Sequence, residues 1–347
     1  MVKIALDAMG GDHAPQYAVH GGIEAARASK GRFQVVLVGD QEAIEKEVAK
    51  HFLTQNLPLS IQHASQVVGM DEKPAVALKQ KTDSSIAVAT RLHFNHEADA
   101  LVSAGNTGVV MAHALFGLKR VKGIRRPAIG SLLPNQMGGT TLLIDVGANV
   151  DSRPEDLVQF GIMGSIYVSR LLEIDRPRVG LLNIGHEEGK GNELVNKTFT
   201  LFKACSCNFI GNVEGGDILR GNCDVVVCDG FVGNIVLKAA ESLHGLFKIN
   251  MRRLVKKYLF SQIGAVLMKP TFDGIRRLFD YQEYGGAPLL GVQGCCIIAH
   301  GKSTPHAIKN AILAAYKFVV ENVNEAIKQQ ATIPIAHNDA EAVPLNG

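Results

Sequence analysis

The segment Val179-Gly-Leu-Leu-Asn-Ile-Gly-His-Glu-Glu-Gly-Lys-Gly-Asn192 joins an apolar run to a glycine-rich loop and the start of a helix. The apolar run ends at Gly185, and apolar side chains recur at helical spacing from Leu194 to Phe202. We therefore expect a short buried strand, a loop carrying Lys190, and then a helix. Because the first N–H groups of a helix have no intrahelical partner, such a loop is suited to bind an anion.

The spacing of the glycines in this loop excludes two common phosphate-binding motifs. A Walker A loop has four residues between its first Gly and the Gly-Lys-Ser/Thr triplet, whereas three residues separate Gly185 from Gly189, and Gly191 replaces the hydroxyl residue. The dinucleotide signature G-x-G-x-x-G does not occur in the chain. The loop therefore predicts either a site for a smaller anion or a simple strand-to-helix turn, and the sequence leaves both open.

The composition is that of a globular protein with a large core. The chain has 347 residues, of which 46% are hydrophobic and 20% are charged. The net charge of +3 is too small to indicate a nucleic-acid partner. No uninterrupted apolar run exceeds about six residues, far short of the roughly 20 that a membrane-spanning helix needs.

Strand and helix patterns alternate along the chain. Strands are expected at Lys3–Asp7, Phe33–Val38 and Leu59–His63, with helical patterns between them. This alternation is typical of a parallel sheet covered by helices on both faces. We expect one α/β/α domain of Rossmann-like type over residues 1–330 and a loose tail over 331–347.

The strand–polar loop–helix pattern of the opening segment recurs three times. The recurrences are the loops at 104–108, 145–149 and 229–234. In an open α/β sheet, ligands bind beyond the carboxyl ends of the strands. We therefore expect the four loops to converge on one polar cleft.

Two stretches are strongly basic. The first comprises Lys119, Arg120, Lys122, Arg125 and Arg126, and it is either a solvated loop or a landing patch for an acidic macromolecule. In the second, the pattern predicts an amphipathic helix from Leu246 to Ile263 within a helical excursion at about 243–282. Its apolar stripe suits an anionic membrane surface or a dimer interface, and arginines and phenylalanines at 272–279 extend the same surface.

Seven motifs in this order resemble those of the bacterial phosphate acyltransferases, which transfer acyl groups from acyl carrier protein to phosphate at the start of phospholipid synthesis. The motifs are Asp7-Ala-Met-Gly-Gly-Asp12, Ser103-Ala-Gly-Asn-Thr-Gly108, Asp145-Val-Gly-Ala-Asn149, Leu182-Asn-Ile-Gly185 with Lys190-Gly-Asn192, Gly211-Asn-Val-Glu-Gly215, Asp229-Gly-Phe-Val-Gly-Asn234 and Tyr284-Gly-Gly-Ala-Pro-Leu-Leu-Gly291. The resemblance covers the chain to about residue 325, and the motifs show no departure from the family pattern.

The resemblance implies a three-layer α/β/α fold similar to isocitrate dehydrogenase and phosphotransacetylases, and a homodimer. It implies that a long-chain acyl group passes from acyl carrier protein to inorganic phosphate, and that a membrane-bound acyltransferase then uses the acyl phosphate to acylate glycerol 3-phosphate. No metal, organic cofactor or nucleic acid is expected. The resemblance also implies that the protein is cytoplasmic and associates peripherally with the membrane.

Residue roles follow from matching this chemistry to the motifs. Phosphate is the nucleophile, so the protein needs anion binding and stabilisation of an oxyanion. We expect Lys190 and the backbone N–H groups of Gly189, Gly191 and Asn192 to hold phosphate. Hydrogen bonds to phosphate or oxyanion are expected from Asn183, Asn106, Thr107 and Asn234, and Asp229 or His186 is expected to orient the proton. The basic segment Lys119–Arg126 is the candidate dock for the acidic carrier protein, and the candidate membrane residues are Leu254, Val255, Tyr258, Leu259 and Ile263.

Two other functions remain as alternatives. An NAD-dependent dehydrogenase or decarboxylase would bind nicotinamide and a divalent metal held by clustered aspartates, for which the sequence supplies Asp145 and Asp229. A non-catalytic scaffold for lipid or carrier protein would not need intact polar loops at four strand ends. Phosphate-dependent loss of an acyl thioester separates all three functions.

Overall fold

A computed structural model describes residues 1–272, 274 and 281–331 of the chain. The strands are β1 (Val2–Asp7), β2 (Phe33–Gly39), β3 (Leu59–His63), β4 (Ala100–Ser103), β5 (Ala128–Pro134), β6 (Thr140–Ile144), β7 (Val179–Leu182), β8 (Phe209–Val213), β9 (Val225–Val227), β10 (Ala287–Leu290) and β11 (Cys295–Ile298). The helices are α1 (Gln16–Ser29), α2 (Gln41–Val48), α3 (Pro74–Gln80), α4 (Ser85–Phe94), α5 (Thr107–His113), the π-helix η1 (Ala114–Leu118), α6 (Pro154–Leu172), α7 (Glu193–Lys203), α8 (Gly215–Arg220), α9 (Gly230–Lys257), α10 (Leu259–Leu267), the 3₁₀-helix η2 (Tyr281–Tyr284), α12 (Pro305–Val320) and α13 (Val323–Ala331).

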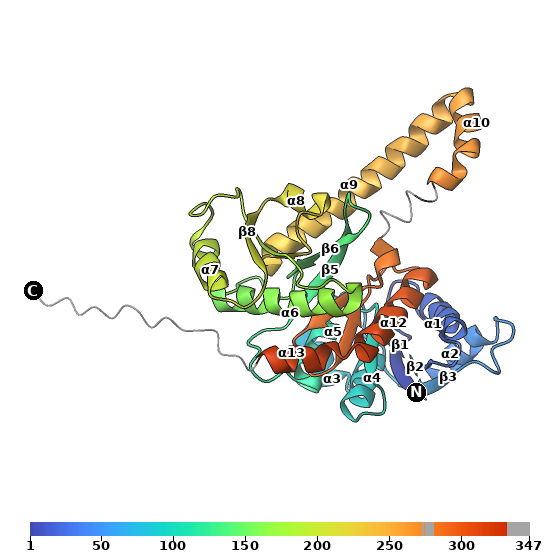
Figure 1. The fold of residues 1–347 in the computed structure, drawn as a ribbon. Helices are drawn as coiled ribbons and strands as arrows, with labels where there is room; N and C mark the ends of the chain where they lie inside the picture. The colour runs from blue at the N-terminus through green and yellow to red at the C-terminus, as the bar shows by residue number, and fades with distance from the viewer. Residues whose placement is uncertain (273, 275–280, 332–347) are drawn as a thin grey trace, which may run out of the picture.

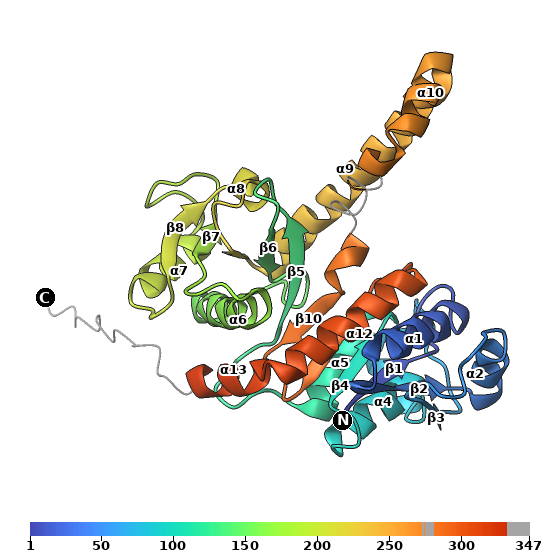
Figure 2. The same ribbon diagram turned by 45° about the vertical axis from the view of Figure 1, so that its right-hand side comes forward.

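The strands of the described residues form one continuous sheet in the order β3-β2-β1-β4-β11-β10-β5-β6-β9-β7-β8. The strands from β3 to β11 are parallel, and so are those from β6 to β8. Between these two halves, β10 pairs antiparallel with β11 and β5, and β5 pairs antiparallel with β6. The sheet therefore consists of two parallel halves that run in opposite senses and meet at β10 and β5, and Figures 1 and 2 show them as two lobes.

Helices cover both faces of this sheet. Successive strand residues point to opposite faces, so Ile4 and Leu6 pack in one core cluster while Ala5 packs in the other. The first cluster receives buried side chains from α1, α2, α6, α7, α12 and α13, and the second receives them from α3, α4, α5 and α8, with partly buried side chains of α9 packed against it. The predicted three-layer α/β/α architecture is confirmed.

Helices α9 and α10 leave the body of the protein as a hairpin, with α10 folded back beside α9 (Figures 1 and 2). The prediction of a single helix from Leu246 to Ile263 is wrong, because the chain is extended at Tyr258 (φ −123°, ψ 134°). The apolar period continues across this residue, and neither Gly nor Pro marks the break, so periodicity could not reveal it. Of the candidate membrane residues, Leu254, Tyr258, Leu259 and Ile263 are exposed and Val255 is half-buried.

The described residues contain no helix long and apolar enough to cross a membrane. The predicted extension of the basic apolar surface falls partly on residues 275–279, which lie outside the described residues. The predicted C-terminal tail lies outside them from residue 332 onward.

A buried histidine ties helix α4 to strand β11. The backbone carbonyl of Ala98 accepts from Nδ1 of His93 (3.0 Å), and Nε2 of His93 accepts from the backbone N–H of Cys295 (3.0 Å). The ring is therefore neutral, with its proton on Nδ1, and burial lowers the pKa of His93. A side chain at Gly294 would collide with this ring, since its Cβ would lie 2.2 Å from Nε2.

We predict that His93 makes the fold sensitive to acid. Because the folded-state pKa is depressed, the unfolded chain binds the proton more readily, so the free energy of unfolding should fall as the pH drops below about 6.5. His93→Gln should destabilise the protein by about 1–3 kcal/mol at pH 7.5 and lose part of this pH dependence. Urea unfolding at pH 7.5 and 5.5 measures both quantities. The exposed histidine His63 supplies the control His63→Gln, and equal pH dependence in His93→Gln and wild type would contradict the assignment.

Candidate functional site

The two halves of the sheet enclose a hollow of about 360 Å³, here called the central hollow. Its polar side chains include those of Thr107, Ser131, Asn234, Tyr284 and His300. Its apolar wall includes Ile129, Leu132, Val146, Val150, Phe231 and Leu237. The loops after β4, β6, β9 and β11 all contribute, because these four strands lie close to the joint between the halves. The central hollow thus combines a few hydrogen-bonding groups with a mainly aliphatic and aromatic surface.

A buried aspartate holds the loop after β6. The two carboxylate oxygens of Asp145 accept hydrogen bonds from the backbone N–H groups of Ile129 (3.1 Å), Gly147 (3.2 Å), Ala148 (2.9 Å) and Asn149 (2.8 Å). The side-chain amide of Asn149 donates a fifth bond (2.9 Å). Asp145 is fully buried, and this burial raises its pKa while the N–H donors oppose the rise. Its role is therefore to fix the loop rather than to contact a ligand.

The start of α9 sits directly on this loop. A Cβ at Gly233 would lie 1.9 Å from the backbone oxygen of Asp145, and one at Gly230 would lie 2.7 Å from the backbone oxygen of Asn149. Only glycine allows so close an approach of helix and loop. This packing also brings Asn234 against Gly147, where an added Cβ would lie 3.7 Å from Asn234 Cβ. Asn234 thereby lines the central hollow.

The loop after β4 has a similar anchor. Buried Asp7 accepts from the Ser103 hydroxyl (2.6 Å), and the Ser103 oxygen accepts in turn from the backbone N–H of Gly105 (3.0 Å). Burial raises the pKa of Asp7, and the hydrogen bond from Ser103 opposes that rise. The anchored loop places Thr107 at the edge of the central hollow.

Five polar residues of the central hollow were not among the predicted site residues, namely Ser131, Lys238, Glu241, Tyr284 and His300. Lys238 and Glu241 lie within α9 and form an ion pair (2.8 Å). His300 follows β11, and its Nδ1 accepts from the backbone N–H of Lys302 (3.1 Å), so the neutral ring carries its proton on Nε2. Its position after a strand was a usable signal. Ser131 lies within β5, and Tyr284 ends η2, so neither follows a strand in the way that guided the prediction.

A second hollow, of about 420 Å³ and here called the loop hollow, lies on the other side of the α9 start. Its polar side chains are those of Asn183, Asn192 and Asp229, Gly191 contributes backbone, and its apolar residues include Leu157, Leu181 and Val232. The predicted single cleft is therefore divided. Thr107 and Asn234 line the central hollow, Asn183, Gly191, Asn192 and Asp229 line the loop hollow, and Lys190 lines neither.

Three predicted site residues cap helices. Asn106, Asn192 and Asp229 are the N-caps of α5, α7 and α9, and their side chains accept from the backbone N–H groups of Val109 (3.1 Å), Val195 (2.9 Å) and Val232 (2.9 Å). The amide of Asn106 also donates to the backbone oxygen of Met70 (2.6 Å). Asn and Asp are preferred both as caps and as anion-site residues, so the sequence pattern cannot separate the two roles.

The glycine-rich loop is held by its own side chains. The amide of Asn183 donates to the backbone oxygen of Lys190 (3.0 Å), and Lys190 Nζ forms an ion pair with Glu187 Oε2 (2.8 Å). The hydrogen bond from Lys190 lowers the pKa of Glu187. Both side chains are at least half exposed (50% and 66%), so Lys190 can exchange Glu187 for another anion at little cost. His186 faces Asp217, with 3.5 Å between Nε2 and Oδ2.

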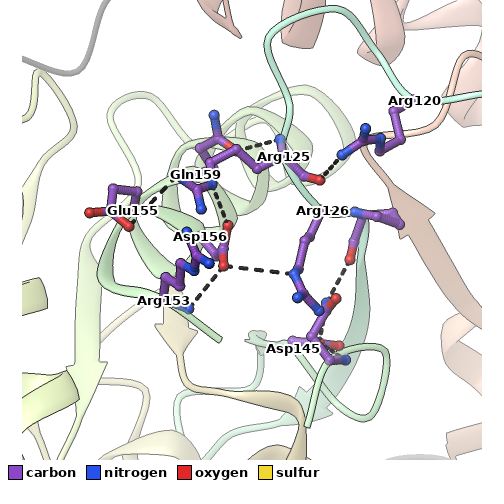
Figure 3. Close-up of polar contacts among 10 residues, drawn as sticks. Arg120, Arg125, Arg126, Asp145, Arg153, Glu155, Asp156 and Gln159 are labelled. Carbon is purple, nitrogen blue, oxygen red and sulfur yellow. Dashed lines mark hydrogen bonds and ion pairs between the residues drawn. The ribbon is translucent and has the colours of Figure 1, made fainter. Parts of the chain in front are cut away.

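The basic segment Lys119–Arg126 is partly neutralised by α6, as Figure 3 shows. Arg125 Nε lies 3.0 Å from Oδ1 of the buried Asp156, and Arg126 Nε lies 3.9 Å from its Oδ2. The guanidinium of Arg120 donates to the backbone oxygen of Arg125. The two lysines of the segment have different surroundings from the arginines. Lys119 Nζ lies 5.8 Å from the ring centre of Phe94, and Lys122 is exposed.

The described residues contain no cluster of three or more His, Cys, Asp or Glu side chains that could hold a metal ion. The two hollows are lined by amides, hydroxyls, an imidazole and backbone groups, together with the Lys238–Glu241 ion pair (2.8 Å) in the central hollow and the carboxylate of Asp229 in the loop hollow.

The model of a protein family described as "Fatty acid synthesis protein" matches residues 2–326. Proteins named phosphate acyltransferase are the matching curated relatives. That of Pelotomaculum thermopropionicum is 50% identical over 328 residues, covering 94% of each chain. That of Desulfitobacterium hafniense is 51% identical over 335 residues, covering 95% of this chain and 97% of the relative.

The chain belongs to the phosphate acyltransferase family. The family resemblance seen in the seven sequence motifs is thereby confirmed.

Solved structures of phosphotransacylases share the fold of this family member. A phosphotransacetylase from Staphylococcus aureus superposes with a TM-score of 0.61 at 15% identity, covering 92% of this chain and 94% of the other. A branched-chain phosphotransacylase from Enterococcus faecalis gives 0.59 at 13% identity, covering 92% and 99%. The predicted phosphotransacetylase-like fold is confirmed, and at these identities the likeness concerns the fold alone.

Proposed function

We propose that this enzyme transfers a long-chain acyl group from the thioester of acyl carrier protein to inorganic phosphate. A phosphate oxygen bonds to the carbonyl carbon, the carbon–sulfur bond breaks, and the leaving sulfur takes up the proton that phosphate gives up. The product, an acyl phosphate, would supply a membrane-bound acyltransferase acting on glycerol 3-phosphate. Membership of a family named for acyl transfer to phosphate supports this reaction.

The central hollow is the feature that carries the proposal. An acyl thioester needs an apolar surface for its chain and hydrogen-bond donors for the negative charge that develops on its carbonyl oxygen. The central hollow offers both, with Ile129, Leu132 and Phe231 beside Thr107 and Asn234. Donors that are already fixed by the surrounding structure stabilise a developing charge without reorganisation, and the Asp145 and Asp7 anchors hold these donors in place.

The glycine-rich loop beside the loop hollow is assigned a separate role. Lys190 is an exposed cation on a glycine-rich loop, and Gly189, Gly191 and Asn192 put backbone N–H groups beside it. We assign to this loop the first capture of phosphate, which must then move into the central hollow to reach the thioester. Asn183 holds the loop, and Asp229 caps the helix that separates the two hollows. A positive charge at an exposed position mainly affects the binding of an anion and has less effect on the chemical step.

We predict that variants of Asn234 and Lys190 affect different kinetic constants. Asn234→Ala should lower kcat on the order of 10²-fold, because it removes a donor to the transition state. Lys190→Ala should raise the KM for phosphate several-fold with little change in kcat. The measurement is phosphate-dependent release of free carrier-protein thiol from acyl-[acyl carrier protein].

Two further variants sharpen this comparison. Asn234→Asp keeps the shape of the side chain but replaces the donor by a negative charge, so it should be at least as impaired as Asn234→Ala. Asn56→Ala, in an exposed loop remote from both hollows, is the control. Wild-type turnover in Asn234→Ala would exclude the central hollow, and an unchanged KM for phosphate in Lys190→Ala would remove that lysine from the mechanism.

The docking of acyl carrier protein is proposed on the basic segment Lys119–Arg126. Because Arg125 and Arg126 are engaged by Asp156, we assign the larger share of attraction for an acidic partner to Lys119 and Lys122. Exposed charges of this kind steer association more than they add to affinity.

We predict that Lys122→Glu raises the KM for acyl-[acyl carrier protein] about three- to tenfold at low ionic strength, with kcat unchanged. Added salt should reduce the difference from wild type. An acyl thioester of pantetheine, which carries no protein, is the control donor and should react equally with both enzymes. Equal KM values for the carrier-protein substrate would exclude this dock.

The α9–α10 hairpin is proposed to contact a membrane surface and a second copy of the chain. Leu259 and Phe260 near its tip are 69% and 88% exposed, Leu267 at the end of α10 is 78% exposed, and Lys256 and Lys257 supply positive charge for anionic lipid. Nearer the body, Leu246, Phe247 and Ile249 are also exposed, and they suit packing against another α9 in a homodimer.

We predict that replacing Leu254 and Leu259 together by Glu lowers binding to anionic liposomes at least tenfold. Each buried leucine contributes about 1.5–3 kcal/mol, and the added carboxylates repel the surface. Co-sedimentation measures the binding, and light scattering of the same samples reports the oligomeric state. The control is the pair Phe52→Glu and Leu53→Glu, which adds the same charge to an exposed apolar site on α2's flank. Unchanged liposome binding with loss of the dimer would assign the hairpin to the dimer interface instead.

A further inference from the structure

A third hollow lies between α4 and the segment formed by α5 and η1, and it shares no lining residue with the central hollow or the loop hollow. Its volume is about 510 Å³. Its surface is mainly carbon, from side chains that include Leu78, Ala87, Phe94 and Phe116. Phe94 and Phe116 are 50% and 68% exposed, so two aromatic rings are left against solvent at a concave site. We call it the α4–η1 hollow.

Two cations lie on this hollow. Arg91 forms a long ion pair with Asp83, 3.6 Å between Nη2 and Oδ1, and Lys119 Nζ lies over the ring of Phe94 at 5.8 Å from its centre. One carboxylate therefore faces two cations, which leaves a net positive charge beside an apolar surface. A ligand with an alkyl body and an anionic head is complementary to both features.

The inner wall of the hollow contains a buried polar atom without a partner. His113 is 6% exposed, and its Nε2 is buried and accepts or donates no hydrogen bond among the described residues. Burial lowers the pKa of His113, so the ring is neutral at pH 7. An unpartnered buried nitrogen is unfavourable, and it shows that packing at this wall does not satisfy every polar group.

The wall is also irregular and tightly packed. His113 directly precedes the π-helix η1, a helix type that is rare and frequent at functional sites. Gly117 of η1 packs on α4 so closely that a Cβ would lie 2.5 Å from the Thr90 methyl carbon. The two helical segments are therefore fixed relative to one another, and the hollow between them is preformed.

We propose that the α4–η1 hollow is a second binding site, for long-chain acyl anions, with the alkyl chain on Phe94 and Phe116 and the anionic head at Arg91 and Lys119. The occupant is a small amphiphile, because inorganic phosphate would leave the aromatic surface uncovered and a neutral lipid would leave the cations unpaired. A free fatty acid and an acyl phosphate share this chemistry. The site is additional to the central hollow, to which the acyl transfer itself is assigned.

Calorimetric titration of the full-length protein with octanoate, decanoate and dodecanoate tests the proposal. Each added pair of methylene groups should tighten binding about tenfold until the hollow is filled. Ala87→Trp, which fills the hollow from a half-buried position on α4, should abolish this binding. Lys119→Glu should weaken it about tenfold, whereas Lys46→Glu, the same charge change on α2, should leave it unchanged. Affinity that is independent of chain length, or unaffected by Ala87→Trp, would overturn the proposal.

A photoreactive fatty acid locates the site and separates it from the reaction centre. Cross-links to residues 78–119 that disappear in Ala87→Trp and persist in Asn234→Ala support the α4–η1 hollow. Cross-links confined to residues 129–150 and 229–241 would overturn it and leave the proposed acyl transfer untouched. A comparison of dodecanoate with dodecyl phosphate then identifies the source: tighter binding of the phosphate indicates an acyl phosphate, and tighter binding of the carboxylate indicates a fatty acid.

Discussion

The hydrogen bonds converging on the carboxylate of Asp145 are the constraint on which the candidate site depends. Five N–H groups from β5 and from the loop after β6 meet two oxygens that are out of contact with water. Removing such an acceptor would leave several buried donors unsatisfied, which costs far more than the bonds contribute net. The resulting loop is rigid, and the start of α9 packs directly on the loop backbone at Gly230 and Gly233. The position of Asn234 is thus determined by a residue that does not line the central hollow.

Much of the fold could be predicted because its cause is local. Alternation of apolar runs and amphipathic stretches placed β1, β2 and β3 within a residue or two of their ends. The inner strands β1 and β2 are mainly apolar because both of their faces are covered, whereas β3 at the edge of the sheet is only partly buried. The reversal of strand direction at β10 and β5 could not be predicted, because periodicity reports which face of a strand is buried and not the sense in which it pairs. That reversal decides which loops meet. The loop after β7 is separated from the joint by β6 and β9, so Lys190 and Asn234 do not share a hollow.

The sequence also predicts only some of the side chains of the candidate site. Thr107 and Asn234 were predicted from polar loops at strand ends, and they line the central hollow. Asn106 and Asp229 came from the same pattern, but their acceptor atoms satisfy helix N–H groups. A cap and an anion ligand use the same chemistry at the same place in a strand–loop–helix unit. Ser131 faces the central hollow from inside a strand, a position that nothing in its neighbours along the chain distinguishes.

Helix α9 connects the candidate site to the tip of the hairpin. It runs without interruption for 28 residues, from Gly230 at the central hollow to Lys257 next to the apolar tip, a span of about 42 Å. A rod of this kind transmits a tilt applied at one end to the other. Since Asn234, Leu237 and Lys238 form one wall of the central hollow, its width is geometrically tied to the orientation of a tip that lies far outside the body. A surface that held the hairpin would therefore also influence the angle of a wall of the hollow in which the proposed chemistry takes place.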